Sequence, residues 1–231
     1  MKINQLVLLL LVTLTGFAQQ QNDSLHTQIF SLSPVSSKVD VVNGMAFGIG
    51  HIFTEKFPKK VNGLNLEINP LVPLVLMFQD WERVDNDSLK MTMNGLHLSA
   101  GGFSGGVKLN GVGVSVYNVS YASNGFSVTG FYNVAKHING VHISGLYNGA
   151  DAASGLFIAA INDADDFTGM RIGVKNGSEY SKGLNIGLVN LNEAEMHGVQ
   201  IGLFNKAGKC KGLQIGVWNI NSKRSLPFIN W

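Results

Sequence analysis

The segment that decides the fold is Gly183–Asn219, GLNIGLVNLNEAEMHGVQIGLFNKAGKCKGLQIGVWN, which holds three copies of one glycine-to-asparagine unit. The unit extends upstream, and from Gly95 onward its glycines are separated by 16, 14, 15, 15, 14, 14, 15 and 14 residues. Repetition at a fixed short period indicates one structural unit stacked on copies of itself. With two irregular early copies, the repeat glycines are Gly44, Gly63, Gly95, Gly111, Gly125, Gly140, Gly155, Gly169, Gly183, Gly198 and Gly212.

Apolar residues alternate within each unit, which is the signature of a β-strand. Leu184, Ile186 and Leu188 lie on one side of the strand, and Asn185 and Gly187 lie on the other. Because apolar side chains collect in protein interiors, we expect the side with Leu184 to face the core. The equivalent residues that we expect to point inward are Val199, Ile201, Leu203, Leu213, Ile215 and Val217.

An asparagine closes each strand, and asparagine suits both turns and ladders of stacked amides. Two residues after it lies a small side chain, as at Ala135 and Ala207, and five residues after it lies an apolar one, as at Ile138 and Phe167. This spacing predicts a chain that turns back around a narrow core. The ladder asparagines are Asn118, Asn133, Asn148, Asn162, Asn176, Asn190, Asn205 and Asn219.

These patterns predict an all-β fold, a parallel β-solenoid of about eleven 14–15-residue repeats. In a solenoid each strand pairs with its counterpart one coil away, at a distance of about 4.8 Å. The alternative is an antiparallel outer-membrane-type β-barrel, in which each unit is one strand. We favour the solenoid because the connections do not alternate between short turns and long loops. Each unit also carries few large apolar residues for a strand of about 9–11 residues that crosses a bilayer.

The chain divides into four parts. Residues 1–18 have the form of a secretory signal peptide, since Lys2 precedes an apolar run that ends in small residues. We expect a polar leader at 19–38 and the β-repeat domain at 39–231. An apolar segment beginning at Pro70 interrupts the repeats, and there we expect a short helical insertion near 74–90. Its expected role is a cap over an end of the stack, with a membrane-surface or partner contact as the alternative.

Composition and motifs exclude several functions. The formal charge is +2, and loss of Lys2 with residues 1–18 leaves +1, which gives no electrostatic case for nucleic acid. The single cysteine, Cys210, excludes an intrachain disulfide framework. The six histidines show no metal-ligand spacing, and the chain has neither a GxSxG elbow nor a P-loop. We therefore predict no enzymatic activity, no catalytic residues and no bound cofactor other than calcium at the acidic edge described next.

Acidic residues recur three positions after the ladder asparagine. In a solenoid they stack along one edge, where like charges about 5 Å apart repel one another. A bound cation would relieve this repulsion, and calcium prefers carboxylate oxygens. The alternative is an acidic edge exposed to solvent. The candidate metal ligands are Asp151, Asp165, Glu179 and Glu193.

A row of aromatic residues directly precedes the ladder asparagines. We expect these rings to form an outward ridge that binds a sugar or a partner surface. The alternative is that the rings pack over neighbouring glycines and stiffen the sheet. The ridge consists of Tyr117, Tyr132, Tyr147, Phe204 and Trp218.

The units of the form GLQIGLxN, together with the ending KRSLPFINW from Lys223 to Trp231, carry a family resemblance. From about Phe30 to Trp231 the chain resembles an uncharacterised family of surface-repeat proteins from Gram-negative bacteria. The resemblance implies export to the cell envelope, at the outer membrane or the surface, with the periplasm as a further location. The aromatic C-terminus also resembles the closing strand of outer-membrane barrels.

We therefore expect an exported, non-enzymatic envelope or surface repeat protein that acts as a scaffold or adhesin-like binder. Its expected partners are a glycan or an envelope protein, with membrane contact left open and nucleic acid excluded. Two alternatives stay open: an outer-membrane β-barrel with a structural or pore role, and a carbohydrate-active enzyme on a β-helix.

Overall fold

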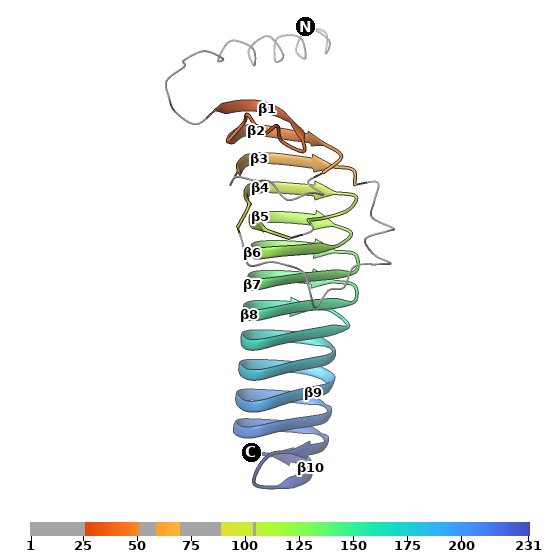
Figure 1. The fold of residues 1–231 in the computed structure, drawn as a ribbon. Coiled ribbons are helices and arrows are strands. Elements are labelled where there is room, and N and C mark those ends of the chain that lie inside the picture. Colours follow the sequence, from red (N-terminus) through yellow and green to blue (C-terminus); the bar gives the residue numbers. More distant parts are fainter. Residues whose placement is uncertain (1–25, 51–58, 70–88, 104) are drawn as a thin grey trace, which may run out of the picture.

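The computed structural model describes residues 26–50, 59–69, 89–103 and 105–231, and these form a long, narrow stack of β coils (Figure 1). Ten strands form one sheet in chain order. Each strand from β1 to β8 pairs in parallel with the next one along the chain, and β9 winds on through sixty residues. The strands are β1 (Thr27–Ser33), β2 (Val41–Gly48), β3 (Lys59–Glu67), β4 (Met91–Ser99), β5 (Val107–Ser115), β6 (Asn118–Thr129), β7 (Tyr132–Ser144), β8 (Tyr147–Ile158), β9 (Ile161–Ile220) and β10 (Ser225–Asn230).

The parallel β-solenoid predicted from the repeats is confirmed. Equivalent residues of successive units lie opposite one another, as Gly44 does to Gly63 and Gly155 to Gly169. The antiparallel alternative is wrong, because it requires neighbouring units to run in opposite directions. Residues at equivalent positions of the repeat therefore form columns along the stack.

The repeat glycines form one continuous column, which fixes the register of the coils. The first ten of them, from Gly44 to Gly198, have φ between 116° and 156°, a region that side chains with a Cβ rarely adopt. A Cβ added to Gly183 would also overlap the carbonyl oxygen of Gly169 in the coil before it. Because only glycine fits both conditions, a slip of one residue would place a clash in the column.

The ladder asparagines lie inside the solenoid and bond to one another through its C-terminal half. The Nδ2 of Asn176 donates to Oδ1 of Asn190 at 2.8 Å and to the carbonyl oxygen of Ile186 at 3.0 Å. The Nδ2 of Asn190 repeats this pattern with Asn205 and Ile201. The side chains of this row are fully buried, so the amides replace the water that they lose on folding with bonds between coils.

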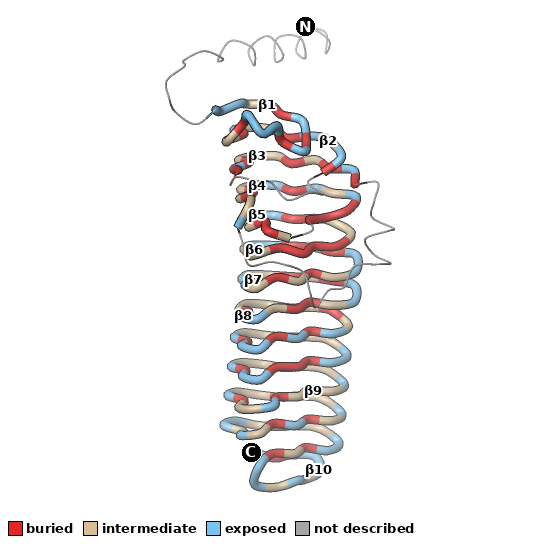
Figure 2. Tube along the Cα trace, in the orientation of Figure 1, coloured by how far each residue is buried: buried red, intermediate tan, exposed pale blue. Residues whose placement is uncertain are grey.

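The predicted direction of the strand faces is wrong. The apolar side lies outside, where Leu188 and Leu203 are more than half exposed. The polar side lies inside, where Asn185, Gln200 and Gln214 are buried. Figure 2 shows this alternation as short buried stretches between exposed and half-buried ones along each coil. The residues predicted to point inward and found outside are Leu184, Ile186, Leu188, Val199, Ile201, Leu203, Leu213, Ile215 and Val217.

The reversed faces have a steric cause. The amide of Asn190 lies over Gly187, where an added Cβ would come within 3.2 Å of the Asn190 side-chain oxygen and 2.7 Å of the Asn176 side-chain nitrogen. Glycine therefore leaves the space that the asparagines fill. The ladder amides fill the space over this position, so a side chain larger than glycine would clash with them.

Apolar packing supplies the rest of the interior. The small and apolar positions predicted after the ladder asparagine are confirmed as inward in the middle of the stack, where Ala135, Ile138, Ala153 and Phe167 form one buried cluster with their neighbours. A second apolar cluster fills the N-terminal coils, and its largest side chain is Phe103.

The ends of the described stack differ from expectation. Strand β1 already pairs with β2, so the sheet begins within the segment predicted to be a polar leader at 19–38. At the other end β10 turns back and pairs antiparallel with the last part of β9, with Asn230 opposite Gln214. The predicted signal peptide at 1–18 and nearly all of the helical insertion near 74–90 lie outside the described residues.

His142 is a buried histidine whose imidazole is held by three hydrogen-bond partners. His142 donates from Nε2 to the carbonyl oxygen of Asn139 at 3.1 Å, which leaves Nδ1 to accept from the Ser127 hydroxyl at 2.7 Å and from Asn133 Nδ2 at 3.3 Å. Burial lowers the pKa of His142 below 6.5, and the bond to the Asn139 carbonyl opposes this only in part. The neutral imidazole is therefore the folded form.

We expect the stability that His142 contributes to be complete above about pH 6.5 and to be lost as the pH falls through its lower folded-state pKa. Below pH 6.5 the unfolded chain binds a proton that the folded chain resists. Thermal unfolding at a series of pH values between 7.5 and 4.5 measures this. The loss should be smaller in His142→Gln, and identical slopes for the two proteins would contradict the assignment.

Candidate binding surfaces

The largest feature of the outer surface is an apolar sheet face that runs the length of the stack. It is formed by the residues one, three and five positions after each repeat glycine, as at Leu213, Ile215 and Val217. All of these positions hold an apolar side chain, alanine or glycine, and all are exposed or half-buried. We call this surface the outer apolar face. The sequence analysis missed it because it assigned the same residues to the core.

Polar but uncharged side chains border the outer apolar face over much of its length. They occupy the position just before the repeat glycine, and their amides form a second, outer ladder. Asn62 Nδ2 donates to Asn43 Oδ1 at 2.7 Å, and Asn94 Nδ2 donates to Asn62 Oδ1 at 2.7 Å. The ladder continues through Asn110, Asn124 and Asn139 and ends at Ser154.

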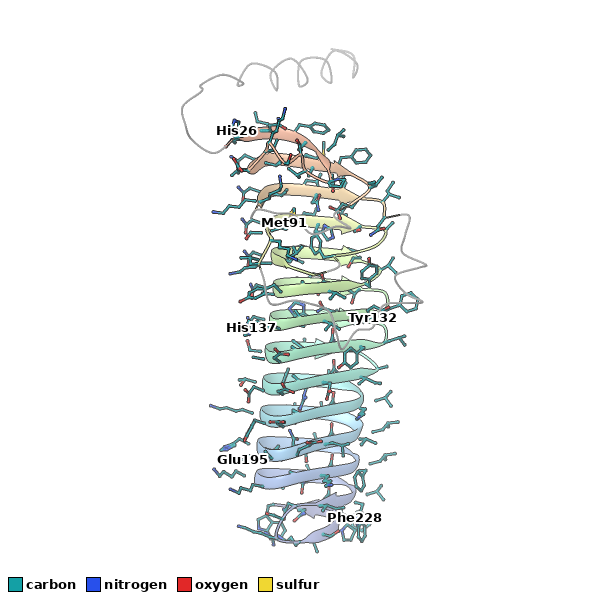
Figure 3. All side chains as sticks on the ribbon, viewed as in Figure 1. His26, Met91, Tyr132, His137, Glu195 and Phe228 are labelled. Carbon is teal, nitrogen blue, oxygen red and sulfur yellow. The ribbon has the colours of Figure 1, made fainter. Side chains whose placement is uncertain are left out.

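The predicted aromatic ridge lies at the far edge of the coils and is only partly outward. Trp218 is 45% exposed, and Tyr132, Tyr147 and Phe204 are half-buried. In Figure 3, Tyr132 lies on one edge of the stack, and His137 and Glu195 lie on the opposite edge.

The prediction that Tyr117 belongs to the outward aromatic ridge is wrong, because its side chain is fully buried. The segment at Gly101–Phe103 lies alongside it, where Tyr117 N donates to the Gly101 carbonyl oxygen at 3.0 Å and Val119 N donates to the Phe103 carbonyl oxygen at 3.0 Å. Burial, with smaller contributions from Tyr132 and Glu67, raises the pKa of Tyr117 to about 12. Tyr117 therefore belongs to the interior.

The predicted acidic row is exposed, as at Asp151 and Asp165. Partial burial, together with the negative charges of Asp151, Asp163 and Asp166, raises the pKa of Asp165, which agrees with the expected repulsion along the edge. Among the described residues, however, no group of three or more histidine, cysteine, aspartate or glutamate side chains is arranged to hold a metal ion. The remaining members of the row, Glu179 and Glu193, are likewise exposed to solvent.

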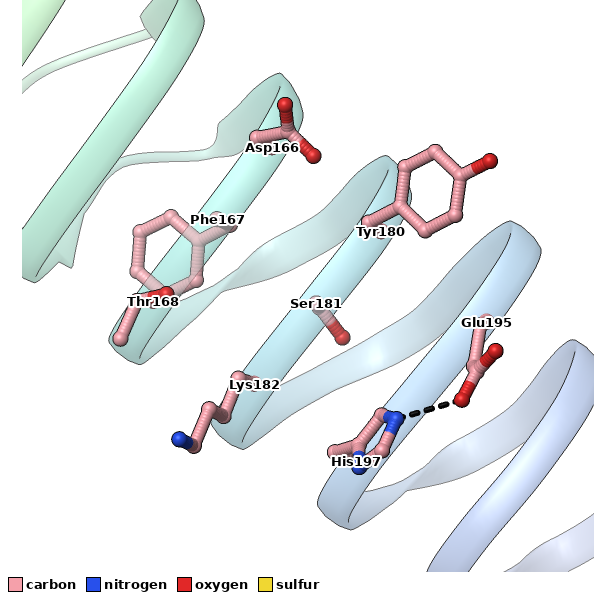
Figure 4. A pocket seen from close by; sticks show the side chains of 8 residues that line it. All are labelled: Asp166, Phe167, Thr168, Tyr180, Ser181, Lys182, Glu195 and His197. Carbon is pink, nitrogen blue, oxygen red and sulfur yellow. Dashed lines mark hydrogen bonds and ion pairs between the residues drawn. The ribbon is translucent and has the colours of Figure 1, made fainter.

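A shallow pocket of about 270 Å³ lies on the edge opposite the aromatic residues (Figure 4). Asp166 and Tyr180 line one side of it, and Lys182 lies on the other. The Glu195 carboxylate accepts from His197 Nε2 at 2.5 Å and bonds to Lys211 Nζ at 2.5 Å. These two bonds lower the pKa of Glu195. With carboxylates, a phenol and an ammonium, the pocket can bond to hydroxyl groups, but the Glu195 carboxylate is already paired with His197 and Lys211.

Arg171 is buried inside the solenoid. Its Nε donates to Asn185 Oδ1 at 2.8 Å, and its terminal nitrogens donate to the Gly177 carbonyl oxygen at 2.5 Å and to Ser178 Oγ at 3.0 Å. The guanidinium also lies 4.5 Å from the centre of the Phe167 ring. Burial lowers the pKa of Arg171 to about 9. Arg171 thus acts as a bridge across the interior and does not reach any outer surface.

Comparison with known proteins gives no relative: no family model, curated protein or solved structure matches the chain. Residues 26–50, 59–69, 89–103 and 105–231 contain no helix that is long and apolar enough to cross a membrane. The function must therefore be inferred from the side chains on the outer surfaces of the solenoid.

Proposed function

We propose that the protein is an exported, non-enzymatic scaffold or adhesin-like binder of the cell envelope or surface, a rod that joins assemblies through its outer apolar face. The observation that carries this proposal is the composition of that face. Residues such as Leu188 and Val217 are more than half exposed, yet no charged or amide side chain interrupts the face along the described stack. Monomeric soluble proteins rarely leave more than a few hundred Å² of contiguous apolar surface in water.

The export part of the proposal rests on residues 1–18, whose positive start, apolar run and small-residue end are those of a signal peptide. The scaffold part rests on regularity. Each unit adds one layer of about 4.8 Å to the stack, so the chain displays the same side chains at even intervals along a stiff axis. Such a surface can bind a partner along the whole length of the stack.

The test is fractionation of Gram-negative cells that express the full chain, followed by sizing of gently extracted assemblies. We expect a processed chain in the envelope or released fraction, in particles larger than the free chain. Leu9→Arg, within the apolar run, should block export. Ile186→Lys with Ile201→Lys should leave export intact and release the free chain, because both side chains lie on the outer apolar face. An unprocessed chain that stays in the cytoplasm, or a wild-type chain that runs as the free species, would refute the proposal.

A further inference from the structure

The outer apolar face is a complete surface that the described residues leave uncovered. Its outermost column is the most open, with Leu188 at 51%, Leu203 at 56% and Val217 at 60% exposure. The backbone beneath it is fully paired through the parallel ladder, so the face offers side chains and no free strand edge. A partner must therefore pack against it as a layer, since it cannot add a strand there.

The size of the face matches that of a stable protein interface. Eleven repeat units at about 4.8 Å spacing and five residues at about 3.3 Å each give a flat area of roughly 800 Å². A standard specific interface buries about 800 Å² on each partner. One further layer of equal size would therefore cover the whole face.

A second copy of the chain presents the same spacing and the same chemistry. Its rows repeat at the same interval, so side chains of one copy can fit between those of the other along the full length. Two sheets pack face to face at about 10 Å through interdigitated aliphatic side chains. The face carries no charge, so identical copies meet without repulsion. Because the face is uncharged, it also has no charge for an oppositely charged partner to bind.

The border of the face argues against a lipid surface as the occupant. Faces that lie on anionic membranes are flanked by lysine and arginine, which bind the headgroups. Here the flanking row is uncharged from Asn43 to Thr168, and as far as Ser154 it is tied into its own ladder of hydrogen bonds. Basic side chains enter the row only in the last three units, at Lys182, His197 and Lys211, so no row of lysine follows the face along its length.

We propose that a second copy of this chain occupies the outer apolar face and forms a face-to-face dimer about a two-fold axis. The inference rests on the proposed function, which makes this face an attachment surface, and it names the partner. The sixth of the eleven repeat glycines is Gly140, which places Ile143 at the centre of the face. A two-fold axis that lies in the interface, along the stack or across it, brings Ile143 next to its own copy in either case.

The first experiment is the mass of the purified processed chain by sedimentation equilibrium. We expect a dimer. Ile186→Lys with Ile201→Lys should weaken association by about two orders of magnitude or more, because two ammonium groups would be buried without partners. The matched control adds the same charges away from the face and from the row that borders it, at the exposed His137 and Ser222, and should remain a dimer. Circular dichroism checks that all variants are folded.

The second experiment locates the contact. In a Cys210→Ser background, Ile143→Cys should cross-link to its own copy with a short bifunctional maleimide, and His137→Cys should not. A monomeric wild-type chain, an open series of larger oligomers, or equal cross-linking at both positions would overturn the dimer. A monomer that binds phosphatidylcholine vesicles through Ile186 and Ile201 would assign the face to lipid instead.

The two proposals fail in different ways. If the pure chain is monomeric while cell extracts still hold it in larger particles that the lysine variants dissolve, the dimer is wrong and the scaffold stands. If the chain is not exported, the scaffold is wrong whatever its oligomeric state.

Discussion

Gly183→Ala is expected to destabilise the protein by about 4 kcal/mol, because it combines a glycine-only backbone conformation with overpacking. Gly183 has φ of 131°, and a Cβ on it would overlap the carbonyl oxygen of Gly169. The coil cannot relax alone, since its neighbours on both sides belong to the same column. Chemical denaturation measured by circular dichroism gives the free energy of unfolding.

Gly130→Ala is the matched control for this substitution. Gly130 is exposed, and its nearest neighbour to an added Cβ is the Val116 carbonyl oxygen at 3.3 Å. We expect the free energy of unfolding to change by no more than about 1 kcal/mol, as is usual for surface positions. Equal losses for the two variants would mean that the column does not fix the register.

Asn190→Asp is expected to cost about 3 kcal/mol or more, although the two side chains have nearly the same shape. Asn190 is fully buried, donates to Asn205 Oδ1 and to the Ile201 carbonyl oxygen, and accepts from Asn176 Nδ2. A carboxylate at this position still accepts from Asn176 Nδ2. It cannot donate to Asn205 Oδ1 or to the Ile201 carbonyl oxygen, so at both places two acceptor oxygens would face each other. A buried charge without partners carries the full loss of hydration.

The outer ladder offers a control of identical chemistry. Asn139 is exposed and accepts from the Ser154 hydroxyl at 2.6 Å, a bond that a carboxylate retains. A carboxylate loses the bond that Asn139 Nδ2 donates to Asn124 Oδ1, but both groups are then in contact with water. Asn139→Asp should therefore change the free energy of unfolding by less than about 1 kcal/mol. The prediction for Asn190→Asp also has a pH signature, because protonation of the new carboxyl at low pH should recover part of the loss. If the two variants unfold with the same free energy, the hydrogen bonds of the ladder asparagines do not stabilise the fold.

The sequence was sufficient to predict the solenoid, because the period is set by glycines and asparagines that act locally. Their spacing also predicted the small inward side chains at Ala135 and Ala207, both of which are buried. Period-two alternation could not say which face is inside. It distinguishes the two faces of a strand but does not say which one is buried. The usual preference for apolar interiors led to the wrong prediction, because here the apolar face is outside. The deciding contacts are those of the ladder amides, which lie over Gly187 and leave no room there for a larger side chain, so that Ile186 is on the outer side.

The candidate sites depended on contacts that no local pattern reveals. Tyr117 leaves the aromatic ridge because the Gly101–Phe103 segment lies beside it. The pocket near Tyr180 lies between side chains of three successive coils, among them Asp166, Lys182 and Glu195, which are far apart in the sequence. The acidic row was found in the predicted register, but register alone does not arrange ligands around an ion.

The antiparallel strand β10 has a consequence for how the rod can grow. A parallel stack is polar, so an open last coil would match the first coil of another molecule, and head-to-tail addition of that kind produces fibres without limit. Strand β10 occupies that edge with the opposite direction, and Pro227 within it cannot donate a backbone hydrogen bond. Strand β10 therefore covers the last coil from Gln214 to Ile220, where a second molecule would otherwise add in parallel.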